Sequence, residues 1–519
     1  MSVLNQPSPS TVSPHAVSTL RPSACPGLLR IVAARDGGLC RIKLPGGELS
    51  AAQAEVIANA SARHAAGVIE VTNRANLQLR GVSAGQEAAL IAALVGAGLG
   101  PLPVDRDSDA LSAATVSSAD DVRNVMISPA AGRDPSALVD TRSLCAELLT
   151  LLQSEARFAA LSPKFALLLD GGERLARVDH PHDVWLAASE DEDGVRFVFG
   201  LAGCPPVVLD TAGGAAKAAR REACADTAVA TASANQSVDA DGDRPRRSLA
   251  GSDACALAAV LPSQVSALVR ALLHTFLDLA AADATRMRHL LAAHSIDAVL
   301  QHAQTYVDFP LARDASLADW QRATPADARL RLGAHPQREP GTWHAGAQPP
   351  LGRLDADTLR GLALLAQQHS HGMLHLTPWQ SVLLPDLRAD ALPAVLAGLN
   401  ALGLACEPTQ AITRLIACAG SSGCAKSLAD TKTDALQLAT RLPAAAAAAA
   451  LEVHLSGCPR SCAAAHCAPY TLLAVAPGSY DLYRREHGLS GFGQCVAHQL
   501  NIEQAAALLD HLTRSHPDA

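Results

Sequence analysis

Four cysteines near the end of the chain are the residues whose type and spacing most clearly indicate chemistry. Cys418 and Cys424 lie in ACAGSSGCAKS, and Cys458 and Cys462 lie in SGCPRSC. Four thiolates are the usual ligands of a [4Fe-4S] cluster, and glycine and serine beside them let the backbone approach the sulfides. A zinc site is the alternative, although zinc cysteines more often have two residues between them. The spacing therefore favours an iron–sulfur cluster.

Pro459, directly after Cys458, suits the first turn of a helix because its missing N–H is not needed there. We therefore expect a helix that begins after Cys458 and turns the positive end of its dipole toward the anionic cluster.

Two rows of polar side chains occur in the first quarter of the chain. The rows are Arg41 and Lys43 in CRIKLPG, and Arg74, Asn76, Gln78 and Arg80 in TNRANLQLRG. Side chains two residues apart on a strand project from one face, so each row predicts a surface of cations and amides. Such a surface suits a large ligand that carries many carboxylates, and a solvated strand face is the alternative.

The elements that must position these residues occur twice. Residues 37–100 are expected to form a strand, a helix opened by Ser50, a second strand and a second helix, and residues 349–404 repeat this order. An Arg-led apolar strand, a loop of small residues and a helix follow each copy, in RNVMISPAAG and in RLIACAGSSGC. Only the second copy carries the four cysteines. The sequence predicts a mixed α/β fold built from a duplicated half.

Composition excludes several classes of protein. With 42 basic and 50 acidic residues the net charge is −8, which argues against a general nucleic-acid or anionic-membrane surface. The chain contains no apolar run long enough to span a membrane and no apolar leader, so we expect a cytoplasmic protein. In that reducing compartment, 13 cysteines favour metal ligation over disulfides.

Taken together, the cysteine pairs and the two polar rows resemble those of the nitrite/sulfite reductase ferredoxin-like superfamily, the hemoprotein beta-component family. The resemblance covers nearly the whole chain and implies two ferredoxin-like half-domains and two α/β domains, related by a pseudo-twofold axis, with a tetrapyrrole between the halves. The domains it implies are a disordered tail at 1–22, half-domains at 23–104 and 331–409, an α/β domain at 105–330 with a flexible insertion at about 211–255, and a cluster-binding domain at 410–519.

The resemblance implies one of two activities. Siroheme-dependent nitrite and sulfite reductases deliver six electrons to a small oxyanion. The related precorrin-3B synthases bind the tetrapyrrole as substrate and use dioxygen to hydroxylate precorrin-3A at C20, with closure of a γ-lactone, in aerobic cobalamin biosynthesis. For that branch the resemblance implies a [4Fe-4S] cluster, a mononuclear non-heme iron, and electrons that come from NAD(P)H through an external reductase or a ferredoxin.

The anion-binding motif separates these activities. Arg123 in RNV matches the reductases, but their closely spaced basic trio is reduced to Lys164 in LSPKFAL, with Pro163 and Ala166 at the other two positions. A small oxyanion would lose charge stabilisation there, so the synthase is favoured and the siroheme reductase is the alternative. Arg123 and Lys164 are the catalytic candidates, although Lys164 also fits an ordinary surface lysine.

The second iron has no assigned ligands. Two histidines and a carboxylate are expected on chemical grounds. The histidine candidates are His344, His369, His371, His375, His454 and His466. Two further rival functions are a cluster-bearing electron carrier, which would have no use for the basic rows, and a zinc-stabilised binding module.

Overall fold

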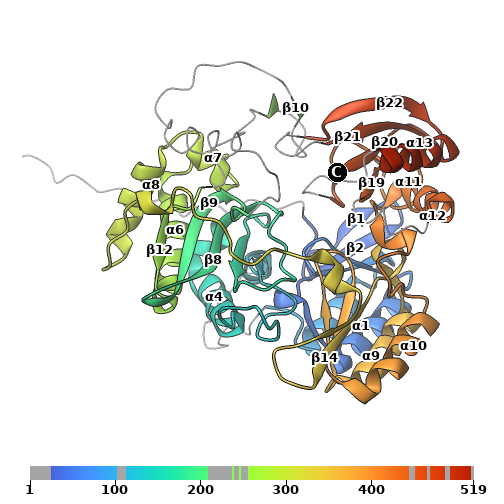
Figure 1. Ribbon diagram of the computed structural model, residues 1–519, viewed down its shortest axis with the longest axis horizontal. Helices are drawn as coiled ribbons and strands as arrows, with labels where there is room; N and C mark the ends of the chain where they lie inside the picture. Colours follow the sequence, from blue (N-terminus) through green and yellow to red (C-terminus); the bar gives the residue numbers. More distant parts are fainter. Residues whose placement is uncertain are drawn as a thin grey trace, which may run out of the picture.

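The structure is a computed structural model that describes residues 25–101, 113–207, 237–238, 245–246, 255–443, 451–464, 468–485 and 491–515. The predicted tail at 1–22 and nearly all of the predicted insertion at 211–255 lie outside these residues. Figure 1 shows the first α/β domain in green on one side, the two half-domains in blue and orange on the other, and the C-terminal domain in red above them.

Each half-domain is a sheet covered by two long helices, and both copies have the same order of elements. The first comprises β1 (Val32–Ala34), β2 (Gly37–Ile42), β3 (Glu48–Ser50), α1 (Ala51–His64), β4 (Val68–Val71), β5 (Leu77–Val82) and α2 (Glu87–Gly96). The second comprises β13 (Gly333–Pro336), β14 (Thr342–Ala347), β15 (Arg353–Asp355), α9 (Ala356–His369), β16 (Met373–Leu376), β17 (Val382–Arg388) and α10 (Leu392–Ala401). The predicted duplication is confirmed.

The half-domains exchange one strand each. The two sheets have the orders β1-β2-β5-β4-β15 and β13-β14-β17-β16-β3, so β3 completes the second sheet and β15 completes the first. The next helix begins at an N-cap in both copies: Ser50 forms a capping box with Gln53, and the Asp355 side chain accepts from the amide of Thr358. Leu49, Ile57, Leu359 and other apolar residues of both halves form one continuous buried core.

The two α/β domains also share a topology. The first has β6 (Val125–Met126), α4 (Arg142–Ser154), β7 (Leu167–Asp170), β8 (His182–Asp191), β9 (Gly194–Gly203), β12 (Ala258–Val260) and α6 (Val265–Leu279). The second has β18 (Leu415–Ala417), α11 (Gly420–Gly423), α12 (Thr431–Arg441), β19 (Val453–Ser456), β20 (Tyr470–Ala476), β21 (Ser479–Arg484), β22 (Gln494–Leu500) and α13 (Ile502–Ser515). In both, three parallel strands are followed by two antiparallel ones.

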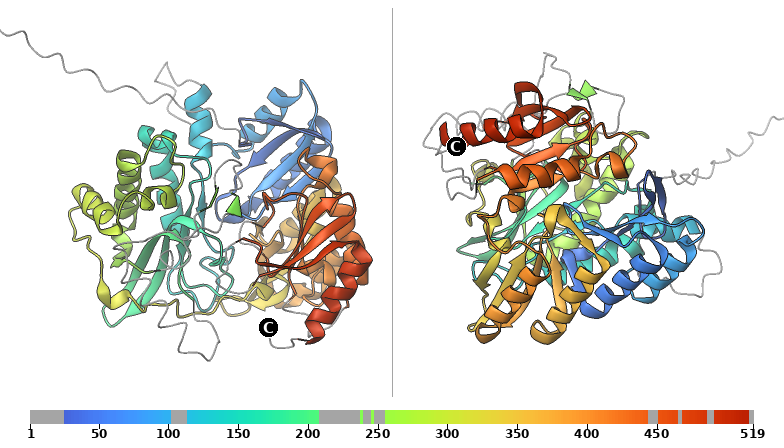
Figure 2. Two further views of the ribbon diagram at one scale, coloured as in Figure 1. Left: turned by 90° about the horizontal axis from the view of Figure 1, so that it is seen from above. Right: turned by 90° about the vertical axis from the view of Figure 1, so that its right-hand side faces the viewer.

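Each α/β domain has a core of its own, separate from that of the half-domains. From above, the green, blue and red parts of the chain surround the middle of the molecule (Figure 2).

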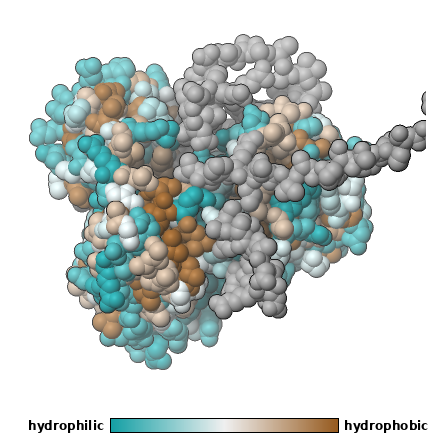
Figure 3. Space-filling model, turned by 180° about the vertical axis from the view of Figure 1, so that it is seen from behind, coloured by the Kyte–Doolittle hydropathy of each residue, from teal (hydrophilic) through white to brown (hydrophobic). Residues whose placement is uncertain are grey.

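Seen from behind, the coloured surface mixes hydrophilic and hydrophobic residues, with a hydrophobic strip near the middle of the view (Figure 3). Within the described ranges, no helix combines the length and the apolar character needed to cross a bilayer.

Candidate functional site

The first cysteine of each pair follows one of two neighbouring parallel strands. Cys418 comes directly after β18, and Cys458 comes two residues after β19. These strands pair in parallel, with Ala417 opposite Leu455, so their carboxyl ends lie at one edge of the sheet. The fold therefore brings together two cysteines that are forty residues apart in sequence, counting from Cys418 to Cys458.

The four thiols lie close enough together to change one another's pKa values. Burial raises the pKa values of Cys458 and Cys462, and the thiols of Cys418 and Cys424 raise both further. The amide of Gly457 donates a hydrogen bond to Cys418 Sγ at 3.3 Å. All four thiols are free, whereas Cys255, elsewhere in the chain, is disulfide-bonded.

The spacing of these sulfurs is wider than that of a closed zinc site. Among the described residues, no three of the four sulfurs lie within 4.8 Å of one another. Sulfurs on a tetrahedral zinc ion lie about 3.8 Å apart, since each Zn–S bond is about 2.3 Å. An iron–sulfur cube holds its four cysteine ligands farther apart than zinc does, because they surround a larger core.

Two glycines hold the cysteine loops against their neighbours. A Cβ on Gly457 would lie 1.8 Å from Ser427 Oγ, and a Cβ on Gly423 would lie 2.5 Å from an Arg80 nitrogen. No other residue fits at either position without moving the surrounding structure. The small residues therefore have a packing role in addition to leaving room for a cluster.

The predicted helix after Cys458 is wrong. The residues from Cys458 to Ala464 form turns. Ser461 has φ 51°, a left-handed conformation that an α-helix cannot contain, and its hydroxyl donates to the Ala464 carbonyl at 2.9 Å. The chain thus bends sharply between Cys458 and Cys462.

The second polar row is divided between a turn and a strand. Gln78 and Arg80 lie on β5, but Arg74 and Asn76 lie in the turn that precedes it, so the predicted single row of four is wrong. The turn is fixed by Thr72, whose hydroxyl accepts from the amides of Arg74 at 3.3 Å and Asn76 at 3.1 Å. Such side-chain bonds compete with strand pairing.

Arg41 lies near Cys462, one of the four candidate cysteines. It donates to Gln78 Oε1 at 2.9 Å, and its Nε is buried without a hydrogen bond among the described residues. Burial lowers the pKa of Arg41, and the Cys25 and Cys462 thiols oppose that shift. The side chains of Arg41 and Cys462 are therefore near enough to interact.

Lys43 is buried beside the acidic end of α3 (Ala113–Asp121). Its ammonium donates to the backbone carbonyl of Asp121. Burial lowers the pKa of Lys43 to about 8, against the opposing charges of Asp120 and Asp121. Lys43 is thus held by the protein itself.

Arg80 is also held by the protein itself. Its guanidinium pairs with Asp36 at 2.7 Å and with Glu70 at 3.5 Å. A third contact, a hydrogen bond of 2.8 Å, runs to the carbonyl of Gly423 between the first two cysteines. These contacts give Arg80 a role in positioning the cysteine loop.

A pocket lies between the first half-domain and the first α/β domain. Its wall includes Leu44 to Gly47, Arg74 to Asn76, Arg123 to Ile127, Ala166 and His182. Arg123 is anchored by Asp120 at 3.3 Å, whereas the side chain of Arg74 forms no hydrogen bond or ion pair within the described ranges. Burial and the charges of Arg286 and Arg41 lower the pKa of Arg74 to about 10. Arg74 is therefore a cation available to a ligand.

The LSPKFAL segment contributes little charge to this pocket. Ala166 lines it, and Lys164, which is half-buried, does not. The structure thus brings Arg74, Asn76 and Arg123 together and leaves Lys164 outside the lining.

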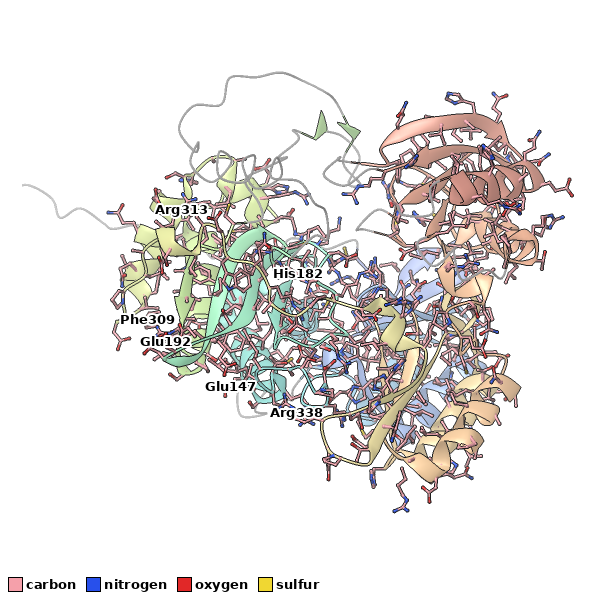
Figure 4. The ribbon with its side chains drawn as sticks, in the orientation of Figure 1. Glu147, His182, Glu192, Phe309, Arg313 and Arg338 are labelled. Atoms are coloured by element: carbon pink, nitrogen blue, oxygen red, sulfur yellow. The ribbon has the colours of Figure 1, made fainter. Side chains whose placement is uncertain are left out.

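His182 is a pocket residue that sequence reasoning missed. It begins β8 and lies where the first α/β domain faces the other domains (Figure 4). Both ring nitrogens are buried without a hydrogen bond of ordinary geometry among the described residues. Burial lowers the pKa of His182 to about 3, and Arg74 and Arg286 add to the effect, so the imidazole is neutral. The signal in the sequence was HPHD, in which one residue separates two histidines.

A second pocket uses the equivalent turn of the second half-domain. Trp379 and Gln380 occupy the positions of Arg74 and Ala75, and line this pocket with Arg177 and Arg331. The Arg177 guanidinium lies 5.1 Å from the Trp379 ring centre. The duplication therefore preserved two clefts with different chemistry.

Comparison with known proteins agrees with this duplicated architecture. The family model "Nitrite/Sulfite reductase ferredoxin-like half domain" matches residues 33–97 and 335–402. "Nitrite and sulphite reductase 4Fe-4S domain" matches residues 118–311, which is the first α/β domain and carries none of the four candidate cysteines. The NirA protein of Mycobacterium tuberculosis has a similar structure, with TM-score 0.68 and 20% identity over 92% of this chain and 81% of that chain.

Two curated relatives differ in how much they match. The chloroplastic ferredoxin–nitrite reductase of Oryza sativa subsp. japonica is 26% identical over 82% of this chain, but the match spans only 64% of that protein. A precorrin-3B synthase from Sinorhizobium sp. is 27% identical over 98% of this chain and 93% of its own length. With both domain types of the superfamily in its duplicated fold, the chain belongs to the nitrite/sulfite reductase family of oxidoreductases.

Proposed function

We propose that the chain is a precorrin-3B synthase, which hydroxylates precorrin-3A at C20 with dioxygen and closes a γ-lactone. The observation that carries this proposal is the match to the Sinorhizobium synthase along 98% of this chain and 93% of that protein. The rice nitrite reductase has similar identity but extends well beyond the match. The similarity to the synthase thus extends along nearly all of both chains, whereas that to the nitrite reductase does not.

The pocket supports the same choice. Arg74 and Arg123 suit the carboxylates of a large substrate, and Arg41 extends the cationic surface toward Cys462. Ala166 and the neutral His182 leave the remaining wall without the positive charge that a small oxyanion needs. The arrangement binds and orients a macrocycle better than it activates nitrite or sulfite.

The residues present fit an iron–sulfur cluster held by Cys418, Cys424, Cys458 and Cys462. Such a cluster would supply electrons one at a time from an external donor, an NAD(P)H-dependent reductase or a ferredoxin. The protein's own contribution is placement, because Arg74 and Arg123 fix the substrate's carboxylates and thereby its orientation. We assign no residues to the mononuclear iron, because the described wall of this pocket has one histidine, His182, and no carboxylate.

The test is a single-turnover reaction with anaerobically purified protein, reduced donor, precorrin-3A and ¹⁸O-labelled dioxygen. We expect one labelled oxygen atom in the tetrapyrrole and the other in water, with two electrons and two protons consumed. The alternative, a siroheme-dependent nitrite or sulfite reductase, is favoured by the matches to nitrite reductases over 82% of the chain. It predicts siroheme absorption in the purified protein and nitrite or sulfite reduction with no label in a tetrapyrrole.

A further inference from the structure

The outer hairpin of the C-terminal sheet brings together three side chains that none of the functions above uses. β21 and β22 are the last two strands of the order β18-β19-β20-β21-β22, so this hairpin lies at the opposite edge from β18 (Figure 1). Asp481 lies on β21, and Cys495 and His498 lie on β22.

Irregular pairing puts these residues on one side of the hairpin. Two residues three apart on a regular strand point to opposite faces. Here the register shifts between Tyr480 and Leu482 and again between Leu482 and Tyr483, and Gln499 has φ 53°. The extra residues on β22 change the alternation, so Cys495 and His498 both reach Asp481.

The donor atoms form a compact set. His498 Nδ1 lies 3.1 Å from Asp481 Oδ2, and Cys495 Sγ lies 3.6 Å from the same nitrogen. One ligand atom of each residue lies within 4.8 Å of the other two, and this is the only such group of three among the described residues.

These separations match those of ligands on one tetrahedral ion. With Zn–N and Zn–O bonds of about 2.0 Å and a Zn–S bond of about 2.3 Å, the nitrogen and oxygen lie about 3.3 Å apart and the nitrogen and sulfur about 3.5 Å apart. The observed separations of 3.1 and 3.6 Å are close to these values, and the exposed His498 ring must turn to aim Nδ1 between Asp481 and Cys495, because Sγ now lies 3.7 Å from Nε2 as well.

The carboxylate is already oriented for this role. The amide of Gln499 donates to Asp481 Oδ1 at 2.9 Å, which turns Oδ2 toward His498. The side chain of Asp481 is 14% exposed and that of His498 is 71% exposed, so the acidic ligand is fixed while the imidazole borders solvent. A hydrogen-bonded ligand of this kind is typical of metal sites.

A nucleophilic Cys–His–Asp arrangement explains the geometry less well. In a nucleophile–base pair the sulfur lies in line with one ring nitrogen. Cys495 Sγ is instead almost equally far from both nitrogens of His498, at 3.6 and 3.7 Å, so it lies in line with neither of them.

We propose that Asp481 Oδ2, Cys495 Sγ and His498 Nδ1 bind a divalent cation of the zinc class, with the fourth position open to water. The ion links β22 to β21 across the irregular part of the hairpin. Binding requires the thiolate, so it releases the Cys495 proton and tightens as the pH rises. The site is separate from the four cysteines, which lie at the other side of the same sheet.

The test is zinc binding to the full chain with its iron–sulfur cluster loaded anaerobically. After equilibration with chelator-buffered Zn²⁺ we expect one zinc per chain by elemental analysis. X-ray absorption at the zinc edge should show one sulfur and two or three nitrogen or oxygen neighbours. Asp481→Asn, Cys495→Ser and His498→Gln should each weaken zinc binding at least tenfold, whereas the matched control His511→Gln, at an exposed histidine of α13, should not.

Two results would overturn the proposal. One is zinc content that is unchanged in all three variants. The other is a zinc spectrum with four sulfur neighbours, which would place the ion at the cluster cysteines. Unfolding of the three variants in urea with and without zinc provides the second measurement, since only the original protein should gain stability from the ion.

Discussion

The guanidinium of Arg80 donates a 2.8 Å hydrogen bond to the carbonyl oxygen of Gly423, and so connects the first half-domain to the loop between Cys418 and Cys424. The two residues are 343 positions apart in sequence. The same guanidinium is held by Asp36 and Glu70, so the loop rests on an arginine that cannot easily move. Arg80, which the sequence predicted to meet a ligand, thus helps instead to shape the loop of the first two candidate cysteines.

Arg80→Gln should release the first cysteine loop. The substitution leaves Asp36 and Glu70 with less compensation, and breaking a buried ion pair costs about 3 kcal/mol. We expect a lower midpoint in urea and faster loss of cluster iron on exposure to a chelator. The matched control is Arg388→Gln, which removes an exposed arginine paired with Asp390 and should leave both properties unchanged. Equal iron release from the two variants would contradict the role given to Arg80.

Gly457→Ala should prevent cluster assembly. The added methyl group would lie 1.8 Å from Ser427 Oγ, so the end of the strand must move. The hydrogen bond from the amide of residue 457 to Cys418 Sγ is then lost. Gly96→Ala is the control, because no atom lies within 4 Å of the new methyl group there and alanine favours the helix. Iron and sulfide per chain should fall in the first variant and stay constant in the second. Full iron content in Gly457→Ala would show that the loop tolerates the shift.

The duplicated fold was predictable because its signals are local. Ser50 begins a helix in both sequence and structure, and the apolar periodicity on either side of it repeats in the second half. The exchange of β3 and β15 was not predictable, since three-residue strands such as Glu48–Ser50 have no periodicity of their own. Their partners are chosen by how the two halves pack.

The candidate site was predictable in residue type and less so in arrangement. The spacing of the cysteines pointed to two pairs that the fold does bring together, because the pairs follow neighbouring parallel strands. Arg74 and Asn76 were wrongly predicted to lie on the strand, because the hydrogen bonds that the Thr72 hydroxyl accepts from their amides hold them in a turn. His182 was missed because its importance depends on a pocket wall built from two domains.

Cys424→Ser should abolish both the cluster and turnover. The hydroxyl is a poor iron ligand, so one corner of the cube loses its thiolate. Cys406→Ala is the matched control, since Cys406 is buried in the core of the half-domains and, among the described residues, its thiol makes only a weak contact with the Leu404 carbonyl. Iron, sulfide and label incorporation should all be lost in the first variant and kept in the second. Full activity in Cys424→Ser would remove the assignment of the four ligands.

His182 should make the protein less stable in mild acid. Its pKa is about 3 in the folded chain and 6.5 as the unperturbed value, so below pH 6.5 the unfolded state binds a proton that the folded state does not. Stability is therefore lost as the pH falls from 6.5 toward 3, by about 2 kcal/mol between pH 6.5 and 5. In His182→Gln this part of the stability loss in acid should disappear. His375→Gln should reduce the loss by a similar amount, because burial also lowers the pKa of His375 to about 3. Urea unfolding at pH 5 and 7 measures the difference, and an identical pH dependence in His182→Gln and the original protein would mean that His182 is protonated in the folded state.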